Sequence, residues 1–311
     1  MIVPPIPDRL EKAIIFLRGE PDGRSWLDGL PARIANYAQQ WDLTLDSIAD
    51  SGAMSCCVYC TAAADGTPAV LKIPVDPESG YTEMALLQRW AAANAAPAVL
   101  QRATTSGVFL MTRIIPGAIA WPDNDGTDST QFGELLTQLN QSHLPEPPEL
   151  KDLADIAHMR MDWARERFAD PQYAEAMNRF GATTHLAHAE NVLDALLHTN
   201  STRHVLHADL QAKNVLQGPA TLYAIDPLGA VGDINAEAGL WIAIQNGPTS
   251  ISERLDHLNS HPLLDDVRLR AWTFVFAVAE YRPYQPAPAE RIEIFIENAD
   301  PVRIINQVRT V

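Results

Sequence analysis

The sequence predicts an α+β protein with a small β-rich first lobe and a larger helical second lobe. Apolar residues alternate with polar ones, as in strands, through much of residues 41–75 and 96–117. From residue 129 onward apolar residues recur at spacings of three and four, as in helices. The 311 residues suffice for one large domain or two lobes. We place the lobe boundary so that residues 1–116 precede it and residues 117–311 follow it.

The first lobe is expected to begin with helices and to continue as a sheet. Residues 8–40 have helical spacing, which Gly19 and Pro31 are expected to interrupt. Asp65-Gly66 lies between two alternating runs and is a strong signal for a hairpin turn. Residues 81–93 read as an amphipathic helix before two further strands.

The second lobe is expected to consist mostly of helices around one short β-hairpin. The predicted helices cover residues 129–143, 152–168, a long stretch ending near residue 198, and residues 251–264, 266–281 and 287–308. HVLHADL reads as a strand that runs into a loop, and NVL and TLYAIDP read as the hairpin. We expect a nucleotide to bind in the crevice between two such lobes.

Composition and charge narrow the class of protein. No run of 18 or more apolar residues occurs, and the N-terminus lacks the basic-then-apolar order of a signal peptide, so we expect a soluble cytoplasmic protein that does not act at a membrane. The net charge of −16 disfavours a nucleic-acid partner. This charge suits a small cationic partner, although a general excess of acidic residues that keeps the protein soluble explains it as well. The sequence leaves the choice between monomer and dimer open.

The segment from Arg203 to Asp233 carries the clearest chemical signal. It places Asp209 two residues after His207, Asn214 five residues later, and Asp226 after the apolar run TLYAI. An aspartate that accepts a hydroxyl proton, followed by an amide and a carboxylate that hold Mg²⁺, is typical of a eukaryotic-type kinase site. The alternative is an ordinary surface turn rich in Asp and Asn.

A lysine near the end of an apolar strand is the second part of this pattern. Lys72 lies in AVLKIPV, in the manner of the strand lysine that contacts the α- and β-phosphates of ATP in kinases. Glu83, eleven residues later, is its expected carboxylate partner, with Glu78 as the second choice. An exposed lysine and an exposed glutamate at a helix start are the alternative.

Two further segments are candidates for nucleotide contacts. Between the first two expected strands, Ser51, Gly52 and Ser55 occupy the place of a phosphate-covering loop, although a single glycine is a weak signal. The strand VFLMTRIIPG is expected to enter the hinge that binds adenine. It would offer the backbone of Arg113 and Ile115, with Thr112 at the back of the pocket.

The chain resembles the aminoglycoside phosphotransferases, specifically the streptomycin 6-phosphotransferase and hydroxyurea-resistance kinase branch. The resemblance rests on GRSWLDGLP from Gly23 to Pro31, on WDL from Trp41 to Leu43, and on the motifs at Ser51–Ser55, Asp65–Lys72 and His207–Asp233. The resemblance spans nearly the whole chain.

The resemblance implies a bilobal protein-kinase-like fold and an ATP- and Mg²⁺-dependent transfer of phosphate to an alcohol group. Asp209 would be the catalytic base, Asn214 and Asp226 the metal ligands, and Lys72 with Glu83 the phosphate-binding pair. The implied acceptor is a streptomycin-like cationic aminocyclitol, whose phosphorylation gives antibiotic resistance. Alternatives are a kinase for an amino sugar or another metabolite, and a nucleotide-binding protein without activity.

A polycationic acceptor needs several carboxylates in a confined site. The candidates lie near the Arg203–Asp233 segment or on the later helices, and Glu237, eleven residues after Asp226, is the best placed of them. The set comprises Glu237, Asp162, Asp265, Asp266 and Glu280.

Overall fold

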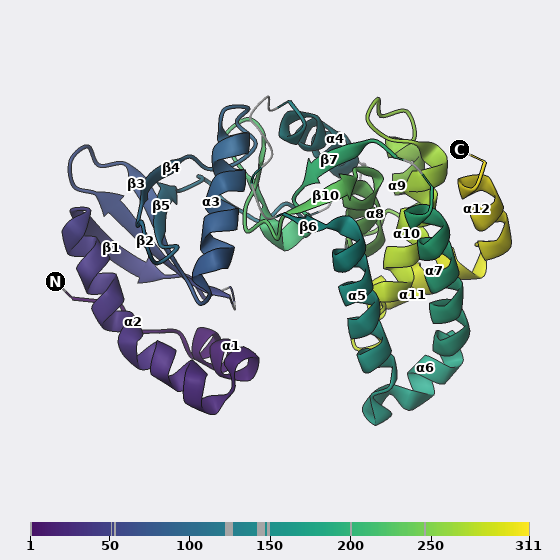
Figure 1. Ribbon diagram of the computed structural model, residues 1–311, viewed down its shortest axis with the longest axis horizontal. Helices are drawn as coiled ribbons and strands as arrows, with labels where there is room; N and C mark the ends of the chain where they lie inside the picture. Colours follow the sequence, from purple (N-terminus) through teal and green to yellow (C-terminus); the bar gives the residue numbers. More distant parts are fainter. Residues whose placement is uncertain are drawn as a thin grey trace. The chain divides into compact units, whose positions relative to one another are not determined.

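The computed structural model describes residues 2–50, 52, 54–121, 127–141, 147, 150–199, 201–245 and 247–310 (Figure 1). The chain divides into two compact units, Met1–Gly117 and Ala118–Val311. The predicted α+β class is confirmed, because the first unit is built on a sheet and the second is mainly helical. In the described part of the chain, no helix is both long and apolar enough to cross a membrane.

A five-stranded antiparallel sheet forms the centre of the first unit, in the order β1-β2-β3-β5-β4. Its strands are β1 (Leu43–Ile48), β2 (Ser55–Ala62), β3 (Pro68–Pro74), β4 (Val99–Arg102) and β5 (Phe109–Thr112). The hairpin predicted at Asp65-Gly66 joins β2 to β3, and Gly66 has a φ of 73° there, which favours glycine. The Asp65 side chain accepts a hydrogen bond from the Thr67 amide in the same turn.

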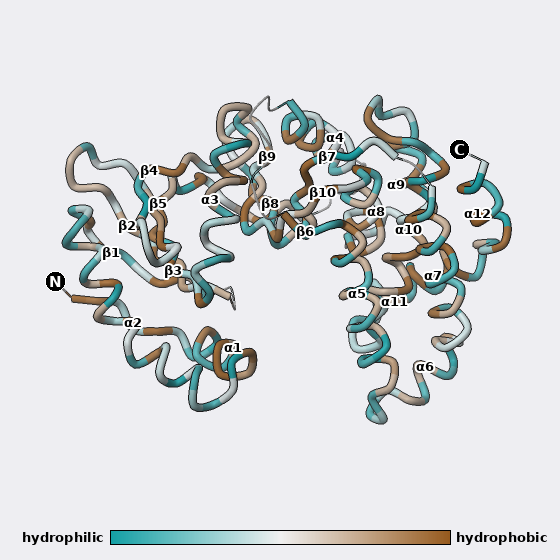
Figure 2. Tube along the Cα trace, viewed as in Figure 1, coloured by the Kyte–Doolittle hydropathy of each residue, from teal (hydrophilic) through white to brown (hydrophobic). Residues whose placement is uncertain are grey.

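Two helices, α1 (Asp8–Arg18) and α2 (Glu20–Gln40), pack on one face of this sheet. Figure 2 shows hydrophobic stretches interleaved with hydrophilic ones along both helices. Gly19 separates them as predicted, but α2 continues through Pro31. The buried stripe of Leu27, Leu30 and Ile34 continues across the proline, so core packing outweighs the one lost backbone hydrogen bond.

The third helix of this unit, α3 (Pro77–Ala91), begins four residues before the predicted start. Asp76 caps it by accepting a hydrogen bond from the Glu78 amide. A Cβ on Gly80 would lie 2.4 Å from the carbonyl oxygen of Gly107, so only glycine lets the helix approach the turn before β5 this closely. This close approach fixes α3, the helix that carries Glu83.

The second unit contains nine α-helices and five short strands among its described residues. The helices are α4 (Thr127–Leu139), α5 (Leu153–Phe168), α6 (Ala174–Phe180), α7 (Ala182–Leu197), α8 (Asn235–Ile244), α9 (Ile251–Leu258), α10 (Asp266–Ala279), α11 (Pro286–Glu297) and α12 (Pro301–Val308). The strands are β6 (Lys151–Asp152), β7 (Arg203–Leu206), β8 (Val215–Gln217), β9 (Leu222–Ala224) and β10 (Ala230–Asp233). The predicted helices are present, with extra breaks at Gly181 and before Pro301.

The core of the second unit forms around α10, which packs against both α7 and α8 (Figure 1). A Cβ on Gly239 of α8 would lie 2.8 Å from the Cβ of Trp272, so the two helices are in close contact. Nearly every residue of α8 and α10 is buried. These two helices form the buried core of this unit.

A three-stranded sheet in the order β6-β10-β7 was not predicted, because strands of two to four residues give too short an alternating pattern. Asp233, at the end of β10, joins this sheet to α10. Its Oδ2 accepts hydrogen bonds from Arg268 Nε at 2.6 Å and from Trp272 Nε1 at 2.8 Å. A buried carboxylate satisfied in this way is structural, and it fixes β7 and the loop that follows.

We expect Gly80→Ala to destabilise the first unit by about 1–3 kcal/mol, because the added methyl group overlaps the Gly107 carbonyl. Gly29→Ala is the matched control, since its Cβ would meet nothing closer than 3.9 Å and alanine favours the helix by up to about 1 kcal/mol. Thermal unfolding of both variants checks this expectation. Equal midpoints would contradict the close approach of α3 to the turn.

Candidate active site

The residues of the Arg203–Asp233 motif meet at one end of the β7 and β8–β9 strands. β7 ends at Leu206, and the next residues form the loop that carries Asp209. A single 3₁₀ turn, Ala212–Asn214, then leads into β8. The Ile225 amide donates to the carbonyl oxygen of Asn214 at 2.9 Å, which places Asp226 directly beyond the paired end of the β8–β9 hairpin.

His207 ties this loop to the segment that follows Asp226. Its backbone carbonyl accepts hydrogen bonds from the amides of Leu228 and Gly229, both at 3.0 Å. Its ring Nδ1 accepts from the Asp209 amide, so Nε2 carries the proton and donates to the Ile225 carbonyl at 2.9 Å. Burial lowers the pKa of His207, and the ring is therefore a neutral structural link.

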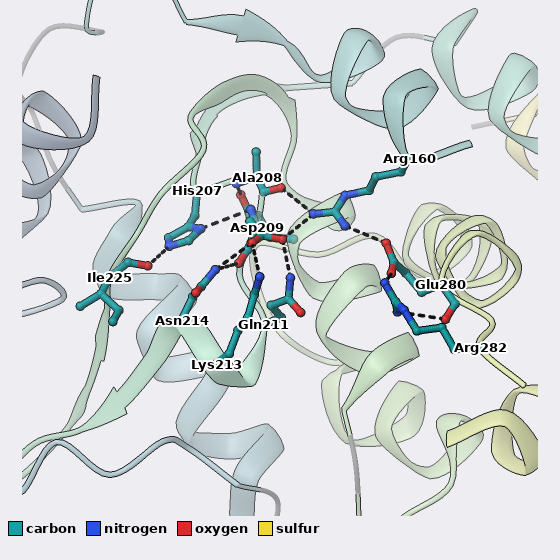
Figure 3. A network of polar contacts seen from close by, with 11 residues as sticks. Arg160, His207, Ala208, Asp209, Gln211, Lys213, Asn214, Ile225, Glu280 and Arg282 are labelled. Carbon is teal, nitrogen blue, oxygen red and sulfur yellow. Dashed lines mark hydrogen bonds and ion pairs between the residues drawn. The ribbon is translucent and has the colours of Figure 1, made fainter. Parts of the chain in front are cut away.

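The carboxylate of Asp209 is the centre of a network of donors (Figure 3). Oδ1 accepts from Arg160 Nη2 at 2.6 Å and from Gln211 Nε2 at 2.5 Å. Oδ2 accepts from Asn214 Nδ2 at 2.8 Å and lies 3.3 Å from Lys213 Nζ. Burial by itself would raise the pKa of Asp209, but Arg160 and Lys213 more than offset it and hold the pKa below its ordinary value. The side chain keeps 19% of its surface exposed, so an ionised carboxylate remains accessible.

Hydrogen bonds hold both the amide and the carbonyl of Ala208, the residue before Asp209. Ala208 has a φ of 65°, a conformation that few residues other than glycine adopt. Its amide donates to Glu237 Oε1 at 2.7 Å, and its carbonyl accepts from Arg160 Nη2 at 3.2 Å. Both partner side chains are buried, so they hold a strained backbone in place.

Asn214 and Asp226 supply oxygen ligands of the kind that Mg²⁺ prefers. Because Asn214 Nδ2 donates to both the backbone and the side chain of Asp209, its Oδ1 points away from that carboxylate. Asp226 has a φ of 58° and is exposed. One amide oxygen and one carboxylate fit a magnesium ion whose other ligands come from phosphates and water.

In the first unit, Lys72 and Glu83 form the ion pair expected from the sequence. Lys72 Nζ lies 2.7 Å from Glu83 Oε1, and both side chains are buried. Lys72 is the cross-strand partner of Cys57, and Ser55 lies two residues before Cys57, so Ser55 and Lys72 share one face of the sheet. Helices α1 and α2 cover the opposite face, where Cys56, Val58 and Leu71 point.

The structure describes only part of the loop that was expected to cover the phosphates. Ser51 lies outside the described residues, and Gly52 has a φ of 101°. The Ser55 hydroxyl is buried and lies 3.9 Å from Cys57 Sγ. A phosphate contact from this loop remains a prediction.

Adenine binding by the backbone of the expected hinge residues remains a prediction. The Arg113 amide donates to the Pro68 carbonyl at 3.0 Å, so this donor is engaged within the sheet. Thr112 is bonded to Ala98 through its amide at 2.9 Å and through its hydroxyl at 3.0 Å. Ile115 is exposed beyond the strand, before a cis peptide bond to Pro116.

Two of the predicted acceptor-binding carboxylates are not available to an acceptor. Glu237 is 4% exposed and holds the Ala208 amide from behind the loop. Glu280 is buried, with Oε1 at 2.7 Å from Arg160 Nη1 and Oε2 at 2.7 Å from Arg282 Nη2. Their sequence positions gave no indication that both side chains point into the protein.

The other three carboxylates lie on the helices as ordinary polar residues. Asp162 is exposed and paired with Arg165 on α5. Asp265 caps α10 by accepting from the Arg268 amide at 2.8 Å, and Asp266 is exposed in the first turn of that helix. Among the hydrogen bonds and ion pairs of the described residues, none joins these three to the Asp209 loop. Acceptor binding by them remains a prediction.

Sequence reasoning missed Arg160 and Gln211, both of which contact the Asp209 carboxylate. A signal for Arg160 was present. The buried residues of α5 include Ile156, Ala157, Met161 and Ala164, and Arg160 occupies a core position in that stripe. An arginine at a core position implies a buried anionic partner.

The family model and the relatives that match this chain point to the same family. The model of the aminoglycoside/hydroxyurea antibiotic resistance kinase family matches residues 40–280. Streptomycin 6-kinase of Streptomyces griseus is 29% identical over 283 residues, which cover 86% of this chain and 87% of the relative. Hydroxyurea phosphotransferase of Kitasatospora aureofaciens is 30% identical over 261 residues, covering 82% of this chain and 73% of the relative.

Solved structures share the fold at low sequence identity. A choline/ethanolamine kinase family protein from Mesorhizobium loti has a TM-score of 0.62 at 15% identity, covering 92% of this chain and 99% of that one. The aminoglycoside phosphotransferase APH(4)-Ia, in a ternary complex with ADP and hygromycin B, has a TM-score of 0.54 at 16% identity. That match covers 88% of this chain and 97% of the other. The predicted kinase-like fold is confirmed.

Burial raises the pKa of Glu237 to about 7, above the ordinary value of 4.5. Between these two values the folded protein binds a proton that the unfolded chain has lost, so stability falls as pH rises through this window. Glu237→Gln keeps an acceptor for the Ala208 amide but does not titrate. We therefore expect urea unfolding to show that the wild type loses stability relative to this variant between about pH 5 and about pH 7.

The exposed carboxylate of Asp266 provides the control for this experiment. Asp266→Asn should follow the wild-type pH dependence. Parallel stability curves for the wild type and Glu237→Gln would mean that Glu237 does not carry a raised pKa.

Proposed function

Since the chain belongs to the aminoglycoside/hydroxyurea antibiotic resistance kinase family, we propose that it transfers the γ-phosphoryl group of ATP to a hydroxyl of a streptomycin-like aminocyclitol. The chain is a phosphotransferase with an alcohol acceptor. Phosphorylation removes a hydroxyl donor and adds about −1.5 to −2 of charge, which spoils recognition of the antibiotic by its target. The product is an inactive antibiotic, and the activity confers resistance.

The observation that best supports this function is the state of Asp209. Its carboxylate is ionised, partly exposed and held by donors from both sides. In our proposal it orients the acceptor hydroxyl and accepts its proton as the bond to phosphorus forms. Phosphoryl transfer passes through a loose transition state, so the position of such a base matters more than its strength.

Two other pairs of residues would bind the metal and the nucleotide. Asn214 Oδ1 and the Asp226 carboxylate would hold Mg²⁺, which neutralises charge on the β- and γ-phosphates. The Lys72 ammonium would contact the α- and β-phosphates while Glu83 keeps its side chain extended. The neighbour APH(4)-Ia was crystallised with ADP, which supports ATP as the phosphoryl donor.

A smaller hydroxyl acceptor is the second candidate. The hydroxyurea phosphotransferase matches at 30% identity over 261 residues and the streptomycin 6-kinase at 29% over 283. In addition, Glu237 and Glu280 are engaged inside the protein and do not contribute to a cationic acceptor site. An amino sugar or another metabolite with a free hydroxyl belongs to the same class of acceptors.

We expect the purified protein to consume ATP in the presence of streptomycin and to form a phosphorylated antibiotic detectable by mass spectrometry. Hydroxyurea, other aminoglycosides, amino sugars and a neutral sugar complete the panel. Asp209→Asn is the matched control, and its turnover should fall by about 10²-fold or more, because a positioned base typically contributes 10²–10⁴-fold. Turnover with hydroxyurea alone would favour the second candidate, and near-wild-type turnover of Asp209→Asn would remove the base assignment.

Asp226→Ala should abolish Mg²⁺-dependent transfer, because its carboxylate is the charged member of the proposed metal site. Titration of activity with Mg²⁺ measures this effect. Asp256→Ala, which removes an exposed carboxylate from α9, is the control and should titrate like the wild type. Identical Mg²⁺ dependence in the Asp226 variant would assign the metal to other residues.

A further inference from the structure

Arg160 is a buried cation placed directly against the proposed catalytic base. It lies on α5, its side chain is 5% exposed, and its guanidinium contacts acceptors from two distant parts of the second unit. Nη2 donates to Asp209 Oδ1 at 2.6 Å and to the Ala208 carbonyl at 3.2 Å. Nη1 donates to Glu280 Oε1 at 2.7 Å. One side chain therefore links the loop of the base to the end of α10.

The charges alternate along this link (Figure 3). Asp209 contacts Arg160, Arg160 contacts Glu280, and Glu280 contacts Arg282 at 2.7 Å. Glu280 is as buried as Arg160, so neither charge can exchange its partner for water. Breaking one contact would leave a buried charge uncompensated, which is why such a pair holds a fixed geometry.

Arg160 also acts on the strained peptide before the base. The Ala208 carbonyl accepts from Arg160, and the Ala208 amide donates to Glu237. With its amide and its carbonyl both held by buried side chains, Ala208 keeps its positive φ, and the direction of the Asp209 side chain is set.

We propose that Arg160 and Glu280 are positioning residues for phosphoryl transfer: Glu280 orients the Arg160 guanidinium, which in turn fixes the Asp209 carboxylate and the Ala208 peptide. The proposal rests on the proposed role of Asp209 as the base. It replaces the expectation that Glu280 binds the acceptor.

The other donors to Asp209 cannot substitute for this contact. Lys213 is 60% exposed and lies 3.3 Å from Oδ2, so water screens its charge. Gln211 and Asn214 belong to the same loop as Asp209 and move with it. Arg160 alone among these four donors lies on a helix outside the loop, and its planar fork reaches two carboxylates at once.

The test compares Arg160→Lys with the wild type in steady-state kinetics. Lysine keeps the positive charge but cannot bridge Asp209 and Glu280 with two separate nitrogens. We expect kcat to fall about 10- to 100-fold, as for loss of a charge-assisted hydrogen bond, while the KM values for ATP and for the acceptor stay within about twofold.

Arg254→Lys is the matched control for damage to a buried arginine. Arg254 is fully buried on α9, is ion-paired with Asp128 of α4 at 3.3 Å, and donates to the Gln245 carbonyl at 2.9 Å. It should lower the unfolding temperature without a comparable loss of kcat. Equal losses of kcat in the two variants would overturn the proposal.

Glu280→Gln separates positioning from acceptor binding. Glutamine still accepts a hydrogen bond from Arg160 but lacks the charge, so kcat should fall about threefold to tenfold with an unchanged acceptor KM. A raised acceptor KM with normal kcat would make Glu280 an acceptor ligand and overturn its positioning role. If Asp209→Asn retained turnover, the assignment of Asp209 as the base, on which this proposal rests, would fail. If that variant is inactive while Arg160→Lys has normal kcat, only the positioning proposal fails.

Discussion

Two buried side chains, the carboxyl group of Glu237 and the guanidinium of Arg160, hold the peptide of Ala208, and the geometry of the candidate site depends on these two contacts. The peptide has a positive φ, and Asp209 follows it directly. Without partners, the amide and carbonyl of a strained residue would relax toward an ordinary conformation and redirect the next side chain. Carboxylate and guanidinium partners from α8 and α5 make the strained form the stable one, so the helical packing of the second unit sets the direction of the base.

In the first unit, too, a buried polar contact fixes the position of a side chain of the candidate site. Its sheet separates two environments, with α1 and α2 packed on one face and Lys72 on the other. Strand alternation decides which side chains share the face of Lys72, and the buried ion pair with Glu83 then fixes the ammonium group. The close contact between Gly80 and the turn at Gly107 holds α3 at the distance that this pair requires.

The contacts of the described residues do not identify the side chains that would bind the acceptor. The net charge of −16 attracts cations to the protein but does not show where they bind. The carboxyl groups of Glu237 and Glu280 are engaged inside the protein, one by the Ala208 amide and the other by Arg160 and Arg282. Buried carboxylates near a base are therefore poor predictors of a cationic substrate, because burial usually means that a partner is already present.

The sequence by itself determined the class of fold, the five strands of the first unit and most helices of the second, but not α8 or the β6-β10-β7 sheet. The local patterns around His207, Asp209, Asn214 and Asp226 were sufficient because a loop and a hairpin place residues that are near in sequence close together in space. Only the tertiary structure decided which distant side chains surround Asp209. Arg160 lies 49 positions away in the chain, and its contact depends on how α5 packs against the loop, which no local pattern records. The same reason explains the error for Glu237, since its position in sequence is close to the site while the packing of α8 turns its carboxylate behind the loop.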